Sequence, residues 1–173
     1  NLAYDEALLR EPGSESYLRF WESPSYFVVV GHGNSIKKEV NISACEKENI
    51  PILRRCSGGG TVLQGPGCLN YTLILPTDRE GVTSISETTC TIMKANAEAL
   101  SNRYIDIRVR GISDLCNNNL KFSGNAQRRL KNKLLFHGTF LYKFDLSLVS
   151  QFLSHPSNEP SYREKRTHHN FIN

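Results

Sequence analysis

The 173-residue chain has a mass of 19.5 kDa and a formal charge of +4, which fit one soluble globular domain with a mild preference for acidic partners. No apolar run approaches the roughly 18 residues of a transmembrane helix, and the N-terminus lacks the apolar stretch of a secretory signal, so no membrane association is expected. Five widely spaced cysteines without a Cys-x-x-Cys pair predict reduced thiols in a cytoplasmic compartment, rather than a zinc site or a disulfide scaffold.

Short strands dominate the N-terminal half. A helix is expected over residues 2–10, followed by strands over 17–21 and 27–30. Asn41 is a candidate cap for a helix over 42–48. Further strands are expected over 52–55, 61–63 and 69–75, with the turn signal Gly65-Pro66-Gly67 between the last two.

The C-terminal half contains the longest helical pattern, from Ser84 to Asn102, which opens with a Ser84–Glu87 capping box. Strands are expected over 107–109, 114–116 and 134–142, and Asp145 is expected to cap a helix over 146–153. Residues 156–166 are predicted as loop, and 167–172 as a helix that the chain does not finish. Neighbouring strands of this kind predict an α+β fold with a mixed, largely antiparallel sheet and flanking helices.

The segment Arg54 to Thr61 reads Arg-Arg-Cys-Ser-Gly-Gly-Gly-Thr. Consecutive glycines cost about 0.5–1 kcal/mol each to order relative to alanine, so they are expected where backbone N–H groups approach an anion closely. Two arginines beside them would complement a phosphate or carboxylate. The segment is neither a Walker loop nor a dinucleotide-binding fingerprint, because no Gly-Lys-[Ser/Thr] and no helix follows. A glycine-rich hairpin with surface arginines is the alternative.

Two further segments carry chemistry. Residues 121–129 place Lys121 before small polar residues and a basic pair, and such a lysine can reach a phosphate or a developing oxyanion. The alternative is a solvated basic loop. The run Phe136 to Thr139 puts a histidine and a glycine inside a strand, where the glycine would let a ligand or another backbone come close. A packed strand histidine is the alternative there.

In combination these segments resemble the lipoate–protein ligase A family, within the biotin and lipoate ligase superfamily, over about residues 18–153. The ordered matches are the glycine segment with Asn70-Tyr71, then Ser113-Asp114-Leu115, then 121–128, then His137-Gly138-Thr139. The resemblance implies one class II synthetase-like catalytic domain over residues 1–173. The N-terminus and the C-terminal helix are expected to be incomplete, and no separate C-terminal accessory domain is expected.

The resemblance also implies an activity. Members of this family use ATP and Mg²⁺ to convert lipoate or octanoate into an acyl adenylate, and then pass the acyl group to a lysine of a carrier domain. The implied partners are acidic lipoyl domains of 2-oxoacid dehydrogenases or the glycine-cleavage H protein, with no nucleic acid, no membrane and a monomeric enzyme.

Site roles follow from the same resemblance. Lys121 is the implied catalytic residue, and Asp114 lies near the adenylate and its metal ion. The chemistry needs such groups, because a carboxylate that attacks the α-phosphorus of ATP must overcome repulsion between anions. The implied substrate and ATP contacts are Arg55, Ser57, Gly58, Gly59, Gly60, Asn70, Arg128, His137, Gly138 and Thr139.

The chain departs from the family pattern at two positions, and a transferase stays open as a rival activity. Ligases often show His-Asp and Asn-x-Asn where this chain has Gln64-Gly65 and Cys68-Leu69-Asn70, which leaves the acyl substrate unassigned. An octanoyl or lipoyl transferase would use a cysteine thioester. The stretch around Asp106 contains no cysteine, and the thiols next to the motifs are Cys56, Cys68 and Cys116.

The remaining alternatives are less well supported. A biotin ligase would show a Lys-Trp-Pro-Asn run, which is missing. A non-catalytic acyl-binding, carrier-binding or nucleic-acid-binding protein could use a phosphate-tracking strip. Its candidate residues are Arg128, Arg129, Lys131 and Lys133.

Overall fold

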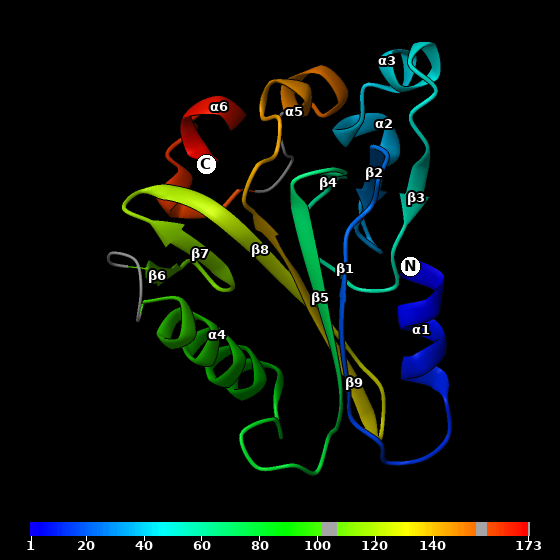
Figure 1. Cartoon of the computed structure of the whole chain (residues 1–173), viewed down its shortest axis with the longest axis vertical. Helices are drawn as coiled ribbons and strands as arrows, with labels where there is room; N and C mark the ends of the chain where they lie inside the picture. The colour runs from blue at the N-terminus through cyan, green and yellow to red at the C-terminus, as the bar shows by residue number, and fades with distance from the viewer. Residues whose placement is uncertain (102–106, 155–158, 173) are drawn as a thin grey trace.

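The computed structural model describes residues 1–101, 107–154 and 159–172. Its elements follow the chain with helices at both ends and a mixture of strands and helices between them (Figure 1). The order is α1 (Leu2–Arg10), β1 (Tyr17–Trp21), β2 (Phe27–Val30), α2 (Ile36–Glu39), α3 (Ile42–Lys47), β3 (Ile52–Arg54), β4 (Val62–Gln64), β5 (Cys68–Pro76), α4 (Ile85–Ser101), β6 (Ile107–Arg110), β7 (Asp114–Asn117), β8 (Leu120–Arg129), β9 (Lys133–Leu141), α5 (Ser147–Phe152), η1 (Ser161–Arg163) and α6 (His168–Phe171).

The strands form two sheets. The larger sheet has six strands in the order β1-β5-β9-β8-β7-β6, and all its neighbours are antiparallel. The smaller sheet has the order β3-β2-β4, with β2 parallel to β3 and antiparallel to β4. The predicted α+β class with a mixed, largely antiparallel arrangement is therefore confirmed.

The two faces of the large sheet have different neighbours, and Figure 1 shows α4 and α1 on opposite sides of it. One face packs on α4 through a core that includes Leu115, Phe136 and Met93. The other face meets α1 through Leu9, Ile74 and Leu135. The small sheet has its own core with α5, centred on Val28, Val30 and Phe152. The six-stranded sheet thus lies between an α4 side and a side shared by α1 and the small sheet.

Two of the three predicted caps form, one of them with a shift. The third does not, because α5 begins at Ser147 with Leu146 as its N-cap, and Asp145 Oδ1, before that cap, accepts from the amide of Ser147 (3.0 Å). Asn41 Oδ1 accepts a hydrogen bond from the amide of Ala44 (3.2 Å), as expected for an N-cap. Ser84 Oγ accepts from the amide of Glu87 (3.1 Å), but the Glu87 carboxylate accepts from the amide of Thr83 (3.1 Å), one residue before the expected donor. Helix α4 is described as far as Ser101, and Asn102 lies outside the described residues.

The alternative of a solvated basic loop for residues 121–129 is wrong, because this segment is strand β8 in the interior of the large sheet. The strand was not predicted because its side chains are polar on both faces. Two of those facing α4 make hydrogen bonds there: Gln127 Nε2 donates to Thr89 Oγ1 (2.8 Å), and Asn125 Oδ1 accepts from the Tyr71 hydroxyl (2.6 Å). Apolar alternation, the usual sign of a strand, is therefore absent.

The C-terminal region is partly as expected. Helix α6 occupies the segment predicted as an unfinished helix, with Thr167 as its N-cap. The short helix η1 and the helix α2 were not predicted. Of the predicted loop over 156–166, residues 156–158 lie outside the described residues. Among the helices that the structure describes, none is long and apolar enough to cross a membrane.

Candidate functional site

The predicted site residues of four strands, with the exception of Gly138, lie on one face of the large sheet. Asp114 pairs with Gly124, Gly124 with Thr139, and Thr139 with Asn70, which makes one row across β7, β8, β9 and β5. Ala126 pairs with His137 in the next row of the same face. Because directly paired and alternate residues point to the same side, this row and the next present their side chains to the small sheet and α1. We call this side of the large sheet the site face.

A β-bulge brings Lys121 to the site face. Cys116 pairs with Lys121 and Leu115 with Ser123, so Phe122 has no partner on β7. Without the extra residue, Lys121 would alternate with Ser123 and Asn125 and point toward α4. With the bulge, the ammonium lies over Gly124, where a Cβ would come within 3.0 Å of Nζ. The bulge thereby decides which face receives the predicted catalytic lysine.

Arg55 holds the glycine loop (residues 57–60) through side-chain hydrogen bonds. Its side chain is buried (8% exposed) and its Nη2 donates to the carbonyls of Gly58 (2.6 Å) and Gly60 (2.8 Å). Its Nε donates to Ser57 Oγ (3.1 Å). Burial lowers the pKa of Arg55 to about 10, so the guanidinium remains charged at neutral pH. These donors serve the loop, so Arg55 organises the loop in this structure.

The glycine loop lies against β8. Gly59 has φ +88°, and a Cβ there would approach Arg55 Nη2 to 2.9 Å and Ala126 Cβ to 3.5 Å. Gly31 is needed nearby, because a Cβ would lie 2.1 Å from the carbonyl oxygen of Gly59. A Cβ at Gly58 or Gly60 would meet open space. The loop therefore needs glycine for its own shape at position 59, whereas Gly58 and Gly60 border open space.

Ser57 connects the loop to His137. Ser57 Oγ is fully buried and lies 2.6 Å from Nε2 of His137. Burial, together with the charge of Arg55, lowers the pKa of His137 to about 3, so the ring is neutral. Since Arg55 Nε already donates to Ser57 Oγ, the hydroxyl proton is free to point at Nε2. Arg55, Ser57 and His137 thus form a hydrogen-bond chain from the loop to β9.

A second polar chain ties β4 to the site face. Gln64 Nε2 donates to Thr139 Oγ1 (2.9 Å), which donates to Asn70 Oδ1 (2.8 Å). Gln64 and Asn70 are buried, at 6% and 5% exposed. Gln64 stands where the resemblance expected a histidine, and its side-chain amide forms the link to Thr139. The chain brings together Thr139 and Asn70, two residues for which the resemblance implied substrate contacts.

Lys121 sits in a cluster supplied partly by the C-terminal segment. Its Nζ is 2.8 Å from Asp114 Oδ1, and the Tyr162 hydroxyl donates to Asp114 Oδ2 (2.7 Å). The ring centroid of Phe171, a buried α6 residue, lies 5.9 Å from Nζ. Burial and the hydrogen bond to Asp114 raise the pKa of Tyr162, so its hydroxyl keeps the proton it donates. Sequence reasoning missed both aromatic residues, because only the fold brings them to β7 and β8.

Gly138 is explained by packing on the opposite face. A Cβ at Gly138 would lie 1.7 Å from Asn125 Oδ1 and 2.6 Å from Tyr71 Cε1. Both neighbours belong to the polar contacts with α4, where Asn96 Nδ2 donates to the Tyr71 hydroxyl (2.9 Å). The glycine predicted to let a ligand approach therefore makes room for Asn125.

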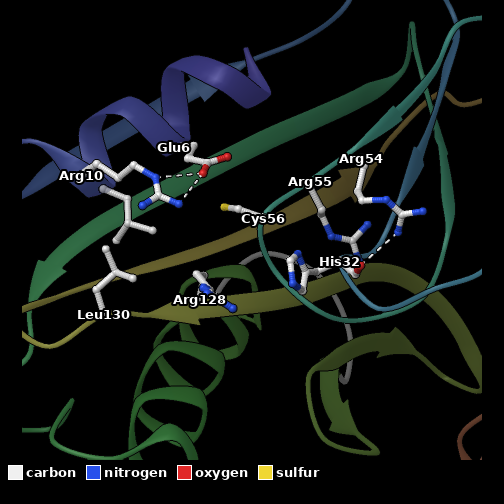
Figure 2. A pocket seen from close by; sticks show the side chains of 9 residues that line it. Glu6, Arg10, His32, Arg54, Arg55, Cys56, Arg128 and Leu130 are labelled. Carbon is white, nitrogen blue, oxygen red and sulfur yellow. Dashed lines mark hydrogen bonds and ion pairs between the residues drawn. The ribbon is translucent and has the colours of Figure 1, made fainter.

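A pocket of about 280 Å³ opens between α1 and the glycine segment. Figure 2 shows Glu6 and Arg10 of α1 on one side, Arg54, Arg55 and His32 on the other, and the Cys56 thiol between them. Leu9, Leu130 and Arg128 complete the lining. The pocket combines apolar leucines with guanidinium groups. Arg55 and Arg128 were predicted from the sequence, but the pocket residues of α1 were missed. No sequence motif connects that helix with the residues that follow β3.

Asp114 is the one predicted metal ligand. Its two oxygens engage Lys121 and Tyr162, and each keeps a further lone pair. Within the described ranges, no three His, Cys, Asp or Glu side chains gather as a metal cluster. One carboxylate fits a Mg²⁺ ion that is held mainly by substrate phosphates, which is how this ion commonly binds.

The three cysteines beside the motifs have thiols that are hard to ionise. Burial raises the pKa of Cys68 to about 12 and also raises the pKa values of Cys56 and Cys116. An activated cysteine nucleophile requires the opposite shift. The burial of these thiols therefore argues against the transferase alternative.

The basic strip proposed for phosphate tracking does not form. Lys133 is buried (4% exposed) and its Nζ donates to the carbonyl of Glu11 (3.1 Å). Arg129 Nη2 donates to the carbonyl of Thr83 (2.8 Å) on the α4 side, whereas Arg128 lines the pocket on the site face. Alternation along β8 separates these charges.

Comparison with known proteins gives a family and relatives. The sequence model of the family described as "Lipoyl protein ligase A/B catalytic domain" matches residues 1–170. Lipoate–protein ligase 1 of Staphylococcus aureus is 33% identical over 155 residues, which are 88% of this chain and 45% of that protein. The chain spans about half the length of the curated relatives it matches first.

Solved structures agree over nearly the whole chain. One belongs to a bipartite lipoate protein ligase from Thermoplasma acidophilum that was studied with its E2 lipoyl domain. The match has a TM-score of 0.85 and 27% sequence identity, and it covers 99% of this chain and 68% of that chain. A lipoate-protein ligase A bound with ATP has a TM-score of 0.79 and 28% identity, over 99% and 71%. A T. acidophilum protein with bound lipoic acid has a TM-score of 0.77 and 27% identity, over 88% and 66%.

Proposed function

Because this chain belongs to the lipoyl protein ligase A/B catalytic domain family, we propose that it activates lipoate or octanoate with ATP and transfers the acyl group to a lysine of a carrier domain. The observation that carries the proposal is the position of Lys121 and the glycine loop on one face of one sheet, facing Gly124 and Ala126. An ammonium and backbone amides on one wall are suited to an acyl phosphate anhydride.

Activation begins when a carboxylate oxygen attacks the α-phosphorus of ATP and pyrophosphate leaves. In our proposal the Lys121 ammonium and the amides of Gly58 and Gly60 stabilise the charge that develops on the phosphate oxygens. Arg55 supports this indirectly by holding the loop carbonyls inward. In the second step the carrier amine attacks the acyl carbon and AMP leaves.

The α1 pocket is our candidate for the acyl chain. Leu9 and Leu130 offer apolar surface, and Arg128 can attract a carboxylate, whereas Arg10 is already paired with Glu6 of the same lining (2.8 Å). A volume of about 280 Å³ is near the lower end of the roughly 300–1,000 Å³ typical of ligand pockets, which suits a short acid. Lipoic acid is bound in the related T. acidophilum protein.

Mg²⁺ is the metal we propose, with Asp114 as the protein ligand and the phosphates of ATP as the others. When bound, the ion would neutralise phosphate charge. ATP is bound in one related ligase structure, which supports the nucleotide.

An acidic lipoyl domain is the carrier we propose. The net charge of +4 favours an acidic partner, and the T. acidophilum relative was studied with its E2 lipoyl domain. That relative is bipartite, and this chain covers 65% of the ligase subunit 1 from the same organism. Transfer can therefore require a second polypeptide, so adenylation and transfer are best assayed separately.

The decisive experiment measures AMP release and carrier acylation with ATP, comparing free lipoate, free octanoate and an octanoyl-carrier thioester. We expect AMP with a free acid and none with the thioester. Acylation from the thioester without ATP, lost when Cys56 is changed to alanine, would instead identify a cysteine transferase. Absence of AMP with every acid would contradict the proposed activation step.

A further inference from the structure

The C-terminal segment contributes a side chain to the lysine cluster. Tyr162 belongs to η1, 41 residues after Lys121 in the sequence, yet its hydroxyl lies 2.7 Å from Asp114 Oδ2. The other oxygen of the same carboxylate is 2.8 Å from Lys121 Nζ. One carboxylate therefore joins the tyrosine to the lysine.

The tyrosine is itself held in place. Its ring centroid is 5.3 Å from that of Phe171, which is 2% exposed. The guanidinium carbons of Arg163 and Arg166 lie 4.8 and 5.2 Å from the Phe171 centroid. Arg166 Nη2 also donates to the carbonyl of Tyr162 (2.9 Å). The segment is thus packed as a unit against β7 and β8.

The lysine touches the same unit. Lys121 pairs with Ile172 in an isolated parallel β-bridge, and Nζ faces the Phe171 ring at 5.9 Å. A long lysine side chain has many rotamers, so its ammonium needs partners to stay over Gly124. Asp114 supplies the charge, and the Tyr162 hydroxyl fixes which way that carboxylate turns.

We propose that Tyr162 is a positioning residue, which orients Asp114 so that the Lys121 ammonium is held on the site face for adenylate formation. This inference rests on the proposed function, because it assigns the purpose of that orientation. Tyr162 is not among the residues that line the pocket, and its hydroxyl bonds to Asp114 and Cys116.

The test compares Tyr162→Phe with Tyr142→Phe. Tyr142 is the control for the hydrogen bond itself, because its hydroxyl also donates to a carboxylate, that of Glu22 (2.9 Å), although the Tyr142 side chain is exposed. We expect Tyr162→Phe to lower kcat for adenylate formation about tenfold with KM for ATP and acid within about twofold, as loss of a hydrogen bond to a charged group predicts. Tyr142→Phe should change neither value.

A double-mutant cycle tests the route through Asp114. If Tyr162 acts through that carboxylate, Tyr162→Phe should cause no further loss in an Asp114→Asn background. Additive losses, or an unchanged kcat in Tyr162→Phe, would overturn the inference.

A chemical readout separates this inference from the proposed function. Labelling by an N-hydroxysuccinimide ester, mapped by mass spectrometry, should modify Lys121 several-fold faster in Tyr162→Phe, with the exposed Lys94 as internal reference. Unchanged or slower labelling overturns the positioning role. A wild-type protein that forms no adenylate would contradict the proposed function. The labelling comparison would still decide whether Tyr162 restrains the Lys121 side chain.

Discussion

Lys121 Nζ reaches Asp114 Oδ1 at 2.8 Å because β8 contains one residue, Phe122, without a partner on β7. The extra residue shifts the alternation of β8, so Lys121 shares a face with Gly124 and Ala126 instead of pointing at α4. A single extra residue in β8 thereby puts a cation on the same face of the sheet as the glycine loop.

Removal of that cation is the first prediction. Lys121→Ala should reduce adenylate formation at least about 100-fold, because a preorganised charge at a developing oxyanion typically contributes that much. Pyrophosphate exchange measures the step directly. Lys131→Ala, at an exposed position of the β8–β9 turn, is the control and should keep normal exchange. Near-normal exchange in Lys121→Ala would reject the catalytic assignment.

Two neighbouring glycines should respond differently to alanine. Gly59→Ala should lower the free energy of unfolding by about 1–2 kcal/mol, because φ is +88° and the new Cβ would crowd Arg55. Gly60→Ala should leave stability within about 0.5 kcal/mol, since its Cβ meets open space, but should raise KM for ATP or acid. Denaturant unfolding and steady-state kinetics check both. Equal stability losses would contradict the proposed division of roles.

Arg55 is expected to stabilise the folded protein through its hydrogen bonds to the glycine loop. Arg55→Lys keeps a charge but cannot serve Ser57, Gly58 and Gly60 together, so we expect a loss of about 2–3 kcal/mol in the free energy of unfolding. Arg79→Lys, at an exposed position, should be neutral. A stable Arg55→Lys variant whose only defect is ligand binding would show that the guanidinium acts on the ligand directly.

His137 should make stability depend on pH. Its pKa is about 3 in the folded protein and about 6.5 when unperturbed, so below pH 6.5 the unfolded chain binds a proton that the folded chain does not. The free energy of unfolding should therefore be highest above about pH 6.5 and fall toward pH 3, by up to about 1.4 kcal/mol per pH unit from this group. His137→Asn should flatten this fall in urea titrations, and His169→Asn at the surface should not. An unchanged slope in His137→Asn would contradict the buried, neutral histidine.

Carrier recognition should depend on ionic strength. Attraction between a chain of charge +4 and an acidic carrier weakens as salt rises, so kcat/KM for the carrier should fall several-fold from about 50 to about 500 mM NaCl. Adenylate formation, measured in the same buffers, corrects for effects on the first step. A transfer rate that does not change with salt would exclude electrostatic steering.

Local patterns were sufficient for most elements. The helices over Leu2–Arg10 and Ile85–Ser101 and the strands about Phe27–Val30 and Cys68–Pro76 follow from periodicity, caps and turn residues, which act between neighbours in the chain. The glycine segment was also recognisable, because three consecutive glycines have a cost that only a special backbone explains. The roles of the residues in the site stay predictions.

The sequence by itself determined the α+β class, the glycine loop and the candidate lysine, since these depend on residue types and short spacings. Tertiary structure alone decided that β8 is an interior strand, that its bulge turns Lys121 to the site face, and that Arg55 binds the carbonyls of the loop. It also brought Tyr162 to Asp114 and α1 to the pocket. These are contacts between segments far apart in the chain. They depend on strand register and burial, which no local pattern encodes.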